Sequence, residues 1–71
     1  MKTLKINDWM AWEMFGYLFF AVYAVSATEW YILGKADDID TACEILAKEI
    51  AVADEDACGE FFVINAEGRR V

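Results

Sequence analysis

The sequence contains no histidine and only two cysteines, Cys43 and Cys58. Two thiols without an imidazole complete a zinc site only if carboxylates or a second chain supply the missing ligands. Two cysteines are also too few for a disulfide framework, so we interpret both as reduced thiols in a cytoplasmic protein. No base stands beside a serine or threonine, and no motif for a cofactor or for nucleic acid is present. These absences predict a protein that is not an enzyme and holds no cofactor or metal.

Positive charge is also scarce, because six lysines and arginines stand against thirteen acids and give a net charge of −7. Residues 1–36 are neutral overall, whereas residues 37–60 contain nine acids and a single base, Lys48. This asymmetry indicates a protein partner with a basic surface, and it excludes direct binding to the nucleic-acid backbone, which the acids repel. The predicted contact residues are Asp37, Asp38, Asp40, Glu44, Asp54, Glu55, Asp56 and Glu60.

The length of 71 residues allows one small domain, residues 1–71, and short chains bury only ~60% of their unfolded surface. Hydrophobic residues make up 59% of the chain, above the ~45–50% that soluble domains usually contain. This composition predicts a globular protein of marginal stability, to which a partner or a second copy contributes.

The longest uncharged run covers residues 14–28 and is bounded by Glu13 and Glu29. A membrane-spanning helix needs ~20 apolar residues, so this run of fifteen is too short by about a turn. Lys2 and Lys5 precede the run, as positive residues precede the apolar region of a secretory leader, but Asp8 and Glu13 also lie in what should be a cationic segment. We therefore predict no membrane segment.

Runs of aromatic and β-branched residues predict the strands. Residues 17–26 and 30–36 form two such runs, and the three residues between them leave room for little but a hairpin. Residues 60–65 form a further run. Shorter strands are expected over residues 2–6 and 69–71.

The residues after Asp37 predict an amphipathic helix of about four turns. Asp38 can cap it, or Thr41 can form a capping box with Glu44. Apolar residues recur at spacings of four, three and four, which predicts the buried face and makes the Cys43 thiol a core group. That face consists of Ile39, Cys43, Leu46 and Ile50, with Ala42 and Ala53 beside them.

Residues 9–15 are open to two interpretations. Asp8 stands where an N-cap would stand and Gly16 can end a short helix, which favours the helical one. In the alternative, a strand extends back through Trp12.

These elements predict an α+β fold, a small antiparallel sheet built from the hairpin and a returning strand, with the long helix on one face. Both faces of the strands are apolar, whereas a sheet with one wet face would alternate apolar and polar residues. Along residues 30–36, simple alternation places Trp30, Ile32 and Gly34 on one face of the strand and Tyr31 and Leu33 on the other.

One amphipathic helix covers one face, so the second face needs residues 9–15, another copy of the chain or a different protein. Two helical turns cannot easily cover three strands, and we therefore predict a homodimer or a tight partner complex. The expected self-association face consists of Trp9, Trp12, Phe20, Val22 and Trp30.

The loop after the long helix has the spacing of the start of an EF-hand, with Asp54, Asp56 and Gly59 in place. The twelfth position is Asn65 rather than a bidentate glutamate, and a strand begins where the loop should continue. The loop is therefore expected to be a solvated acidic segment, without calcium.

We expect a non-enzymatic interaction protein whose acidic segment docks on a basic, nucleic-acid-handling partner by offering carboxylates where phosphates would sit. In size and charge the chain resembles the small phage-encoded inhibitors of restriction or CRISPR systems that act as nucleic-acid mimics. The resemblance lies in overall character, with no motif matched. The alternative is a self-associating structural or regulatory module whose apolar sheet face forms a homodimer or host-protein interface, with the acids providing solubility.

Overall fold

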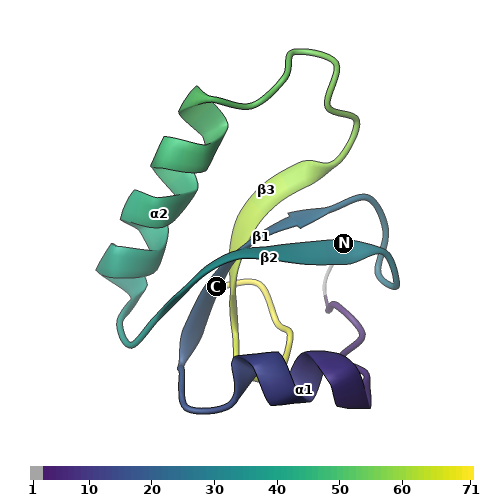
Figure 1. Cartoon of the computed structure of the whole chain (residues 1–71), viewed down its shortest axis with the longest axis vertical. Coiled ribbons are helices and arrows are strands. Elements are labelled where there is room, and N and C mark those ends of the chain that lie inside the picture. Colours follow the sequence, from purple (N-terminus) through teal and green to yellow (C-terminus); the bar gives the residue numbers. More distant parts are fainter. Residues whose placement is uncertain (1–2) are drawn as a thin grey trace.

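The computed structural model describes residues 3–71, in which three strands and two helices form a small α+β fold, as predicted. The strands make one antiparallel sheet in the order β2-β1-β3. The sheet lies between the two helices (Figure 1). The elements are α1 (Asp8–Met14), β1 (Phe19–Ala24), β2 (Trp30–Ala36), α2 (Ile39–Ala51) and β3 (Glu60–Asn65).

The hairpin strands end where backbone N–H groups donate to a carbonyl within the turn instead of to the neighbouring strand. The predicted strands over residues 30–36 and 60–65 have the observed bounds, but the one over residues 17–26 is shorter at both ends. The N–H groups of Val25 and Ser26 both donate to the carbonyl of Glu29, at 2.9 and 3.1 Å, so the turn begins at Val25.

The two ends of the chain lie side by side without forming strands. Thr3 bridges to Arg69, and the Leu4 N–H donates to the Gly68 carbonyl at 2.8 Å. The strands predicted over residues 2–6 and 69–71 are thus reduced to isolated bridges, and Lys2 lies outside the described residues.

A β-bulge interrupts the pairing of β1 with β2. Ala21 of β1 lies opposite Gly34. The next residue, Val22, lies opposite Ile32, so Leu33 is an extra residue on β2. A bulge of this kind bends the strand and increases its twist.

The bulge changes which side chains of β2 share a face. Trp30 and Ile32 pack in the core on the α1 side, whereas Gly34 lies against α2, where a Cβ atom would overlap Ile45 Cγ2. The prediction that Trp30, Ile32 and Gly34 share a face is therefore wrong, because simple alternation does not allow for the extra residue. The missing side chain at Gly34 is what lets α2 approach the sheet closely.

The sheet face opposite α2 is covered by the chain itself. The N-terminal segment and α1 pack on it, and the Trp30 indole N–H donates to the Lys5 carbonyl at 3.0 Å. Phe20, Val22 and Trp30 are therefore buried, and their prediction as part of an exposed self-association face is wrong. This core consists of Leu4, Met14, Phe20, Val22, Ala24, Trp30, Phe62 and Ile64, with Ile6, Met10 and Ile32 packed against it.

Residues 9–14 are helical rather than extended, as the favoured interpretation predicts, and Phe15 follows as the C-cap. The cap is Asn7 instead of Asp8, because the Asn7 side-chain oxygen accepts a hydrogen bond from the Met10 N–H at 2.9 Å. Gly16 has a φ of +90°, a conformation that L side chains rarely adopt, and it turns the chain away after the helix.

Helix α2 is rotated relative to the predicted apolar stripe. Ala42 is fully buried, and Ile45 and Leu46 pack beside it against Val63 of β3. The prediction that Cys43 is a core residue is wrong, because its thiol is exposed. Ile39 and Ile50 of the predicted stripe are also exposed.

Asp38 caps α2, as predicted. Its carboxylate accepts hydrogen bonds from the backbone N–H of Thr41 at 2.7 Å and from the Thr41 hydroxyl at 3.0 Å. These two bonds, the backbone one first, hold the pKa of the Asp38 carboxyl below its usual range. Hydrogen bonds favour the charged carboxylate and therefore lower its pKa.

This lowered pKa predicts an acid-sensitive cap. A carboxyl whose pKa is lower in the folded state stabilises the protein above its unfolded value of about 3.9, and this contribution is lost as the pH falls through the folded value. Asparagine caps helices without titrating, so Asp38→Asn should remove that part of the pH dependence. Urea midpoints followed by circular dichroism at pH 7 and about pH 2.5 measure it. If the urea midpoints of the original chain and of Asp38→Asn differ by the same amount at pH 7 and at about pH 2.5, the prediction is contradicted.

Candidate functional site

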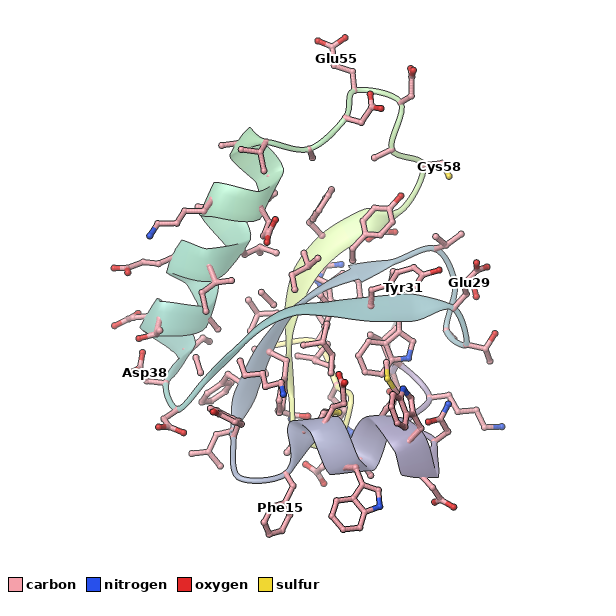
Figure 2. All side chains as sticks on the ribbon, viewed as in Figure 1. Phe15, Glu29, Tyr31, Asp38, Glu55 and Cys58 are labelled. Atoms are coloured by element: carbon pink, nitrogen blue, oxygen red, sulfur yellow. The ribbon has the colours of Figure 1, made fainter. Side chains whose placement is uncertain are left out.

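Seven exposed carboxylates lie along α2 and the loop that follows it, and we call this surface the acidic edge. Figure 2 shows Asp38 at the start of the helix and Glu55 beyond its other end. Within residues 3–71, no lysine or arginine lies within ion-pairing distance of these groups. The acidic edge consists of Asp37, Asp38, Asp40, Glu44, Asp54, Glu55 and Asp56.

The eighth predicted contact residue, Glu60, is separated from the others. It belongs to β3 and lies on the same face of that strand as Phe62 and Ile64, whose side chains face α1 rather than α2. Its carboxylate lies 3.5 Å from the Arg70 guanidinium. The structure therefore leaves seven of the eight predicted acids exposed on α2 and on the segments at its two ends, and it pairs the eighth with a cation.

A second exposed surface lies on the outer side of α1, and we call it the aromatic helix face. Trp9, Trp12 and Phe15 are 70%, 82% and 84% exposed, and Leu18 follows them. Figure 2 shows the Phe15 ring pointing away from the rest of the molecule. Of the five residues predicted for self-association, Trp9 and Trp12 are the two that are accessible.

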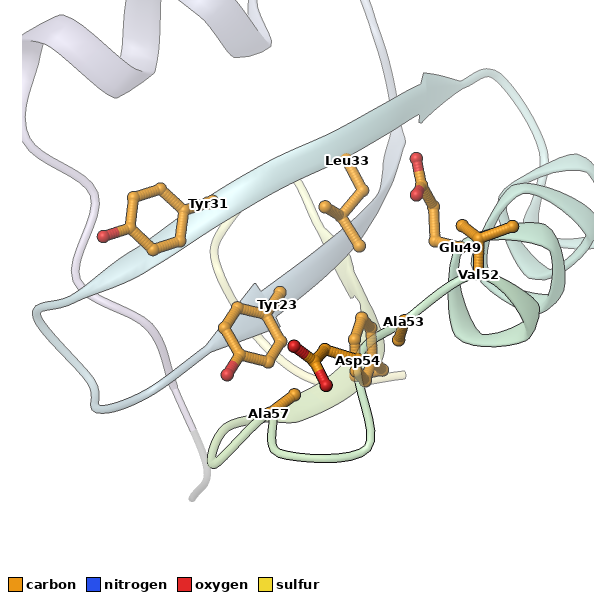
Figure 3. Close-up of a pocket in the computed structure, with 9 residues that line it drawn as sticks. Tyr23, Tyr31, Leu33, Glu49, Val52, Ala53, Asp54 and Ala57 are labelled. Atoms are coloured by element: carbon orange, nitrogen blue, oxygen red, sulfur yellow. The ribbon is translucent and has the colours of Figure 1, made fainter.

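A pocket of about 450 Å³ lies on the α2 side of the sheet, next to the loop of residues 52–59. Figure 3 shows tyrosines on the sheet, with carboxylates on α2 and on the loop that follows it. The volume falls within the ~300–1,000 Å³ usual for ligand pockets. We call this the tyrosine pocket; its lining consists of Tyr23, Tyr31, Leu33, Glu49, Val52, Ala53, Asp54, Ala57 and Phe61.

The base of the tyrosine pocket is set by strand register. Tyr23 on the central strand lies opposite Tyr31 of β2 and also opposite Phe61 of β3, so three aromatic rings cross the sheet in a row. The Tyr23 and Phe61 ring centroids are 4.8 Å apart, and the Tyr23 hydroxyl accepts a hydrogen bond from the Gly59 N–H at 2.8 Å. That bond ties the acidic loop to the sheet.

The tyrosine pocket has no signature in the sequence. Tyr31 and Glu49 are far apart in the sequence, and only the strand register and the rotation of α2 bring them together. The aromatic content of the hairpin is a signal that could point to the site, but it fits a buried core equally well.

Other kinds of site find little support. Among the described residues, no group of three or more histidine, cysteine or acidic side chains is placed to hold a metal. Asn65, at the twelfth position of the EF-hand spacing, accepts hydrogen bonds from the Glu67 and Arg69 N–H groups. No helix in residues 3–71 has the length and apolar character needed to cross a membrane.

Comparisons with known proteins add no assignment to this geometry. No protein-family model matches the chain, and no curated protein or solved structure is significantly similar to it.

Proposed function

We propose that the protein is a non-enzymatic, cytoplasmic interaction protein that binds a basic, nucleic-acid-handling protein through the acidic edge. The observation that carries this proposal is that seven exposed carboxylates follow α2 and its loop with no cation paired to them within residues 3–71. Acids placed only for helix capping would be confined to the first turn, whereas Asp54, Glu55 and Asp56 lie beyond the far end of α2.

The charge density of the acidic edge is comparable to that of a nucleic-acid strand. Helix α2 has 13 residues and is about 20 Å long, and the whole molecule extends 31 Å along its longest axis. One DNA strand carries about six phosphates over 20 Å and about nine over 31 Å. Seven carboxylates, offset by the single base Lys48 on α2, are spread over this distance, which supports a fit to a surface that normally binds phosphates, and they repel nucleic acid itself.

The proposal predicts binding that is sensitive to salt and to competing DNA. Purified restriction enzymes and CRISPR effectors provide the panel, with binding measured by biolayer interferometry at about 50 and 300 mM NaCl. The Kd should rise about tenfold or more between these salt concentrations, and excess duplex DNA should displace the chain. A panel without binding at low salt, or a complex that neither salt nor DNA weakens, would contradict the proposal.

The aromatic helix face supports a second candidate function, self-association with another copy of this chain. A fully exposed aromatic side chain offers about 150–250 Å², so Trp9, Trp12 and Phe15 together offer roughly 350–600 Å². With Leu18 beside them, two copies would bury an area near the lower end of the range for stable complexes, about 1,200 Å² in total. This interface is a helix face rather than the sheet face expected from the sequence.

The distribution of charge is compatible with such a dimer. Residues 1–36 are neutral overall, with two acids on α1 itself, and the acidic edge lies along the other helix. Two copies that meet through α1 would therefore avoid bringing their acidic edges together. Each dimer would present two acidic edges to partners.

A further inference from the structure

We propose that the tyrosine pocket binds one arginine side chain of the basic partner. The inference rests on the proposed function, because an acidic edge selects proteins rich in lysine and arginine. It adds to that function a specific contact, in which a planar cation lies on the aromatic rings and its charge meets the neighbouring carboxylates.

The aromatic base of the pocket suits a guanidinium group. Tyr31 is 54% exposed on the edge strand, and Tyr23 and Phe61 continue the row of rings across the sheet. Guanidinium groups stack on aromatic faces, and the contact strengthens as it is removed from water. The chain already makes such a contact on its other side, where the Arg70 guanidinium lies 4.9 Å from the Phe62 ring centroid.

Two carboxylates complete the site. Glu49 is half-buried on the last turn of α2, and Asp54 belongs to the loop that follows. One oxygen of Asp54 accepts a hydrogen bond from the Asp56 N–H at 3.1 Å, which orients the side chain and leaves the second oxygen available. Carboxylates form strong, charge-assisted hydrogen bonds with guanidinium groups.

The remaining lining suits the apolar stem of an arginine. Leu33, Val52 and Ala53 contribute aliphatic surface, against which the three methylene groups can pack while the charged end reaches the carboxylates. Lysine has a similar stem but a compact, strongly hydrated charge that neither stacks nor bonds in a bidentate manner. An apolar ligand would leave Glu49 and Asp54 against a surface that cannot bond to them.

The position of the pocket favours a cation in addition. Five of its nine lining residues belong to residues 37–60, where nine acids and one base occur, and such a field raises the local concentration of positive groups. The acidic edge therefore attracts the partner broadly, and the tyrosine pocket selects one residue of it.

Single capped amino acids test the pocket separately from the acidic edge. We would titrate the isotope-labelled chain with N-acetyl-arginine amide, its lysine counterpart and the uncharged, planar citrulline counterpart, following amide shifts by NMR. Arginine should bind with a Kd on the order of 1 mM. Its shifts should gather at Tyr31, Val52 and Ala53, and the other two probes should bind about threefold or more weakly.

Matched variants then test the two contacts. Glu49→Gln and Glu44→Gln each remove one charge from α2, but only Glu49 lines the pocket. Glu49→Gln should weaken arginine binding about three- to tenfold and Tyr31→Ala about two- to fivefold, while Glu44→Gln should stay within about twofold. Tyr31 lies on the edge strand and is exposed, so a well-dispersed NMR spectrum is expected for its variant.

The outcomes separate this inference from the proposed function. The pocket assignment would be overturned by any of three results. These are amide shifts outside the pocket when capped arginine is added, equal affinity for the citrulline probe, or an equal loss of arginine affinity in Glu49→Gln and Glu44→Gln. If basic partners still bind in a salt-sensitive way in that case, the acidic edge stands without the pocket. If no basic partner binds the chain at low salt, the proposed function fails whatever the capped arginine does.

Discussion

Replacing Asp37, Asp40, Glu44 and Glu55 with the corresponding amides should raise the Kd for a basic partner about a hundredfold at physiological salt. Exposed ion pairs contribute about 0.2–1 kcal/mol each, and four contributions of about 0.7 kcal/mol, or about threefold, multiply to about a hundredfold. Asp38 is kept because its carboxylate caps α2, and its loss would mix a folding effect with a binding effect. Biolayer interferometry with the partner found in the panel measures the change.

A second quadruple variant provides the matched control for total charge. Amides at four exposed acids outside the acidic edge change the net charge from −7 to −3, as in the first variant. If the acidic edge carries the binding, the Kd of the control variant should rise less than about tenfold. That rise is the part of the affinity that long-range attraction supplies. If both variants lost affinity equally, overall charge alone would account for binding. The control positions are Asp8, Glu13, Glu29 and Glu67.

Trp12→Ser combined with Phe15→Ser should dissociate the proposed dimer and raise its Kd at least a hundredfold. Buried aromatic anchors at interfaces commonly contribute about 2 kcal/mol or more each, and two of them exceed a hundredfold together. Both side chains are more than four-fifths exposed in the single chain, so their loss should leave the fold intact. Sedimentation velocity between about 1 and 100 μM covers the relevant range of Kd.

Val52→Ser combined with Ile50→Ser is the control for the dimer. These side chains are 79% and 49% exposed, at the C-cap of α2 and on its last turn, so their loss reduces surface apolarity without touching α1. The control protein should self-associate like the original. A wild-type chain that sediments as a monomer at the highest concentration would contradict the dimer, and so would dissociation by the control substitutions.

The secondary structure was largely predictable because the local signals agree with the fold. Asp38 caps α2 as expected, and β2 and β3 have the expected bounds. The rotation of α2 was not predictable from its own residues. Its buried face is set by the sheet, where Gly34 leaves space for Ile45, and the bulge at Leu33 brings Gly34 to that side.

The candidate surfaces differ in how visible they are in the sequence. Charged side chains stay in water, so the acidic edge could be predicted from composition along the chain. Aromatic residues occur both in cores and on surfaces, which is why Trp12 and Trp30 look alike in the sequence although one is exposed and the other buried. The tyrosine pocket depends on the register of the strands and on the packing of α2 and its following loop against the sheet. Neither follows from the local sequence pattern.

The joining of the two chain ends has a consequence for synthesis. Leu4 is 2% exposed in the core, and its N–H bonds to the carbonyl of Gly68. During translation this side of the core cannot close until residue 68 has left the ribosome, and a contact between such distant residues slows folding. Until then the apolar face of the hairpin is open, and exposed apolar surface of this kind makes a nascent chain prone to aggregation.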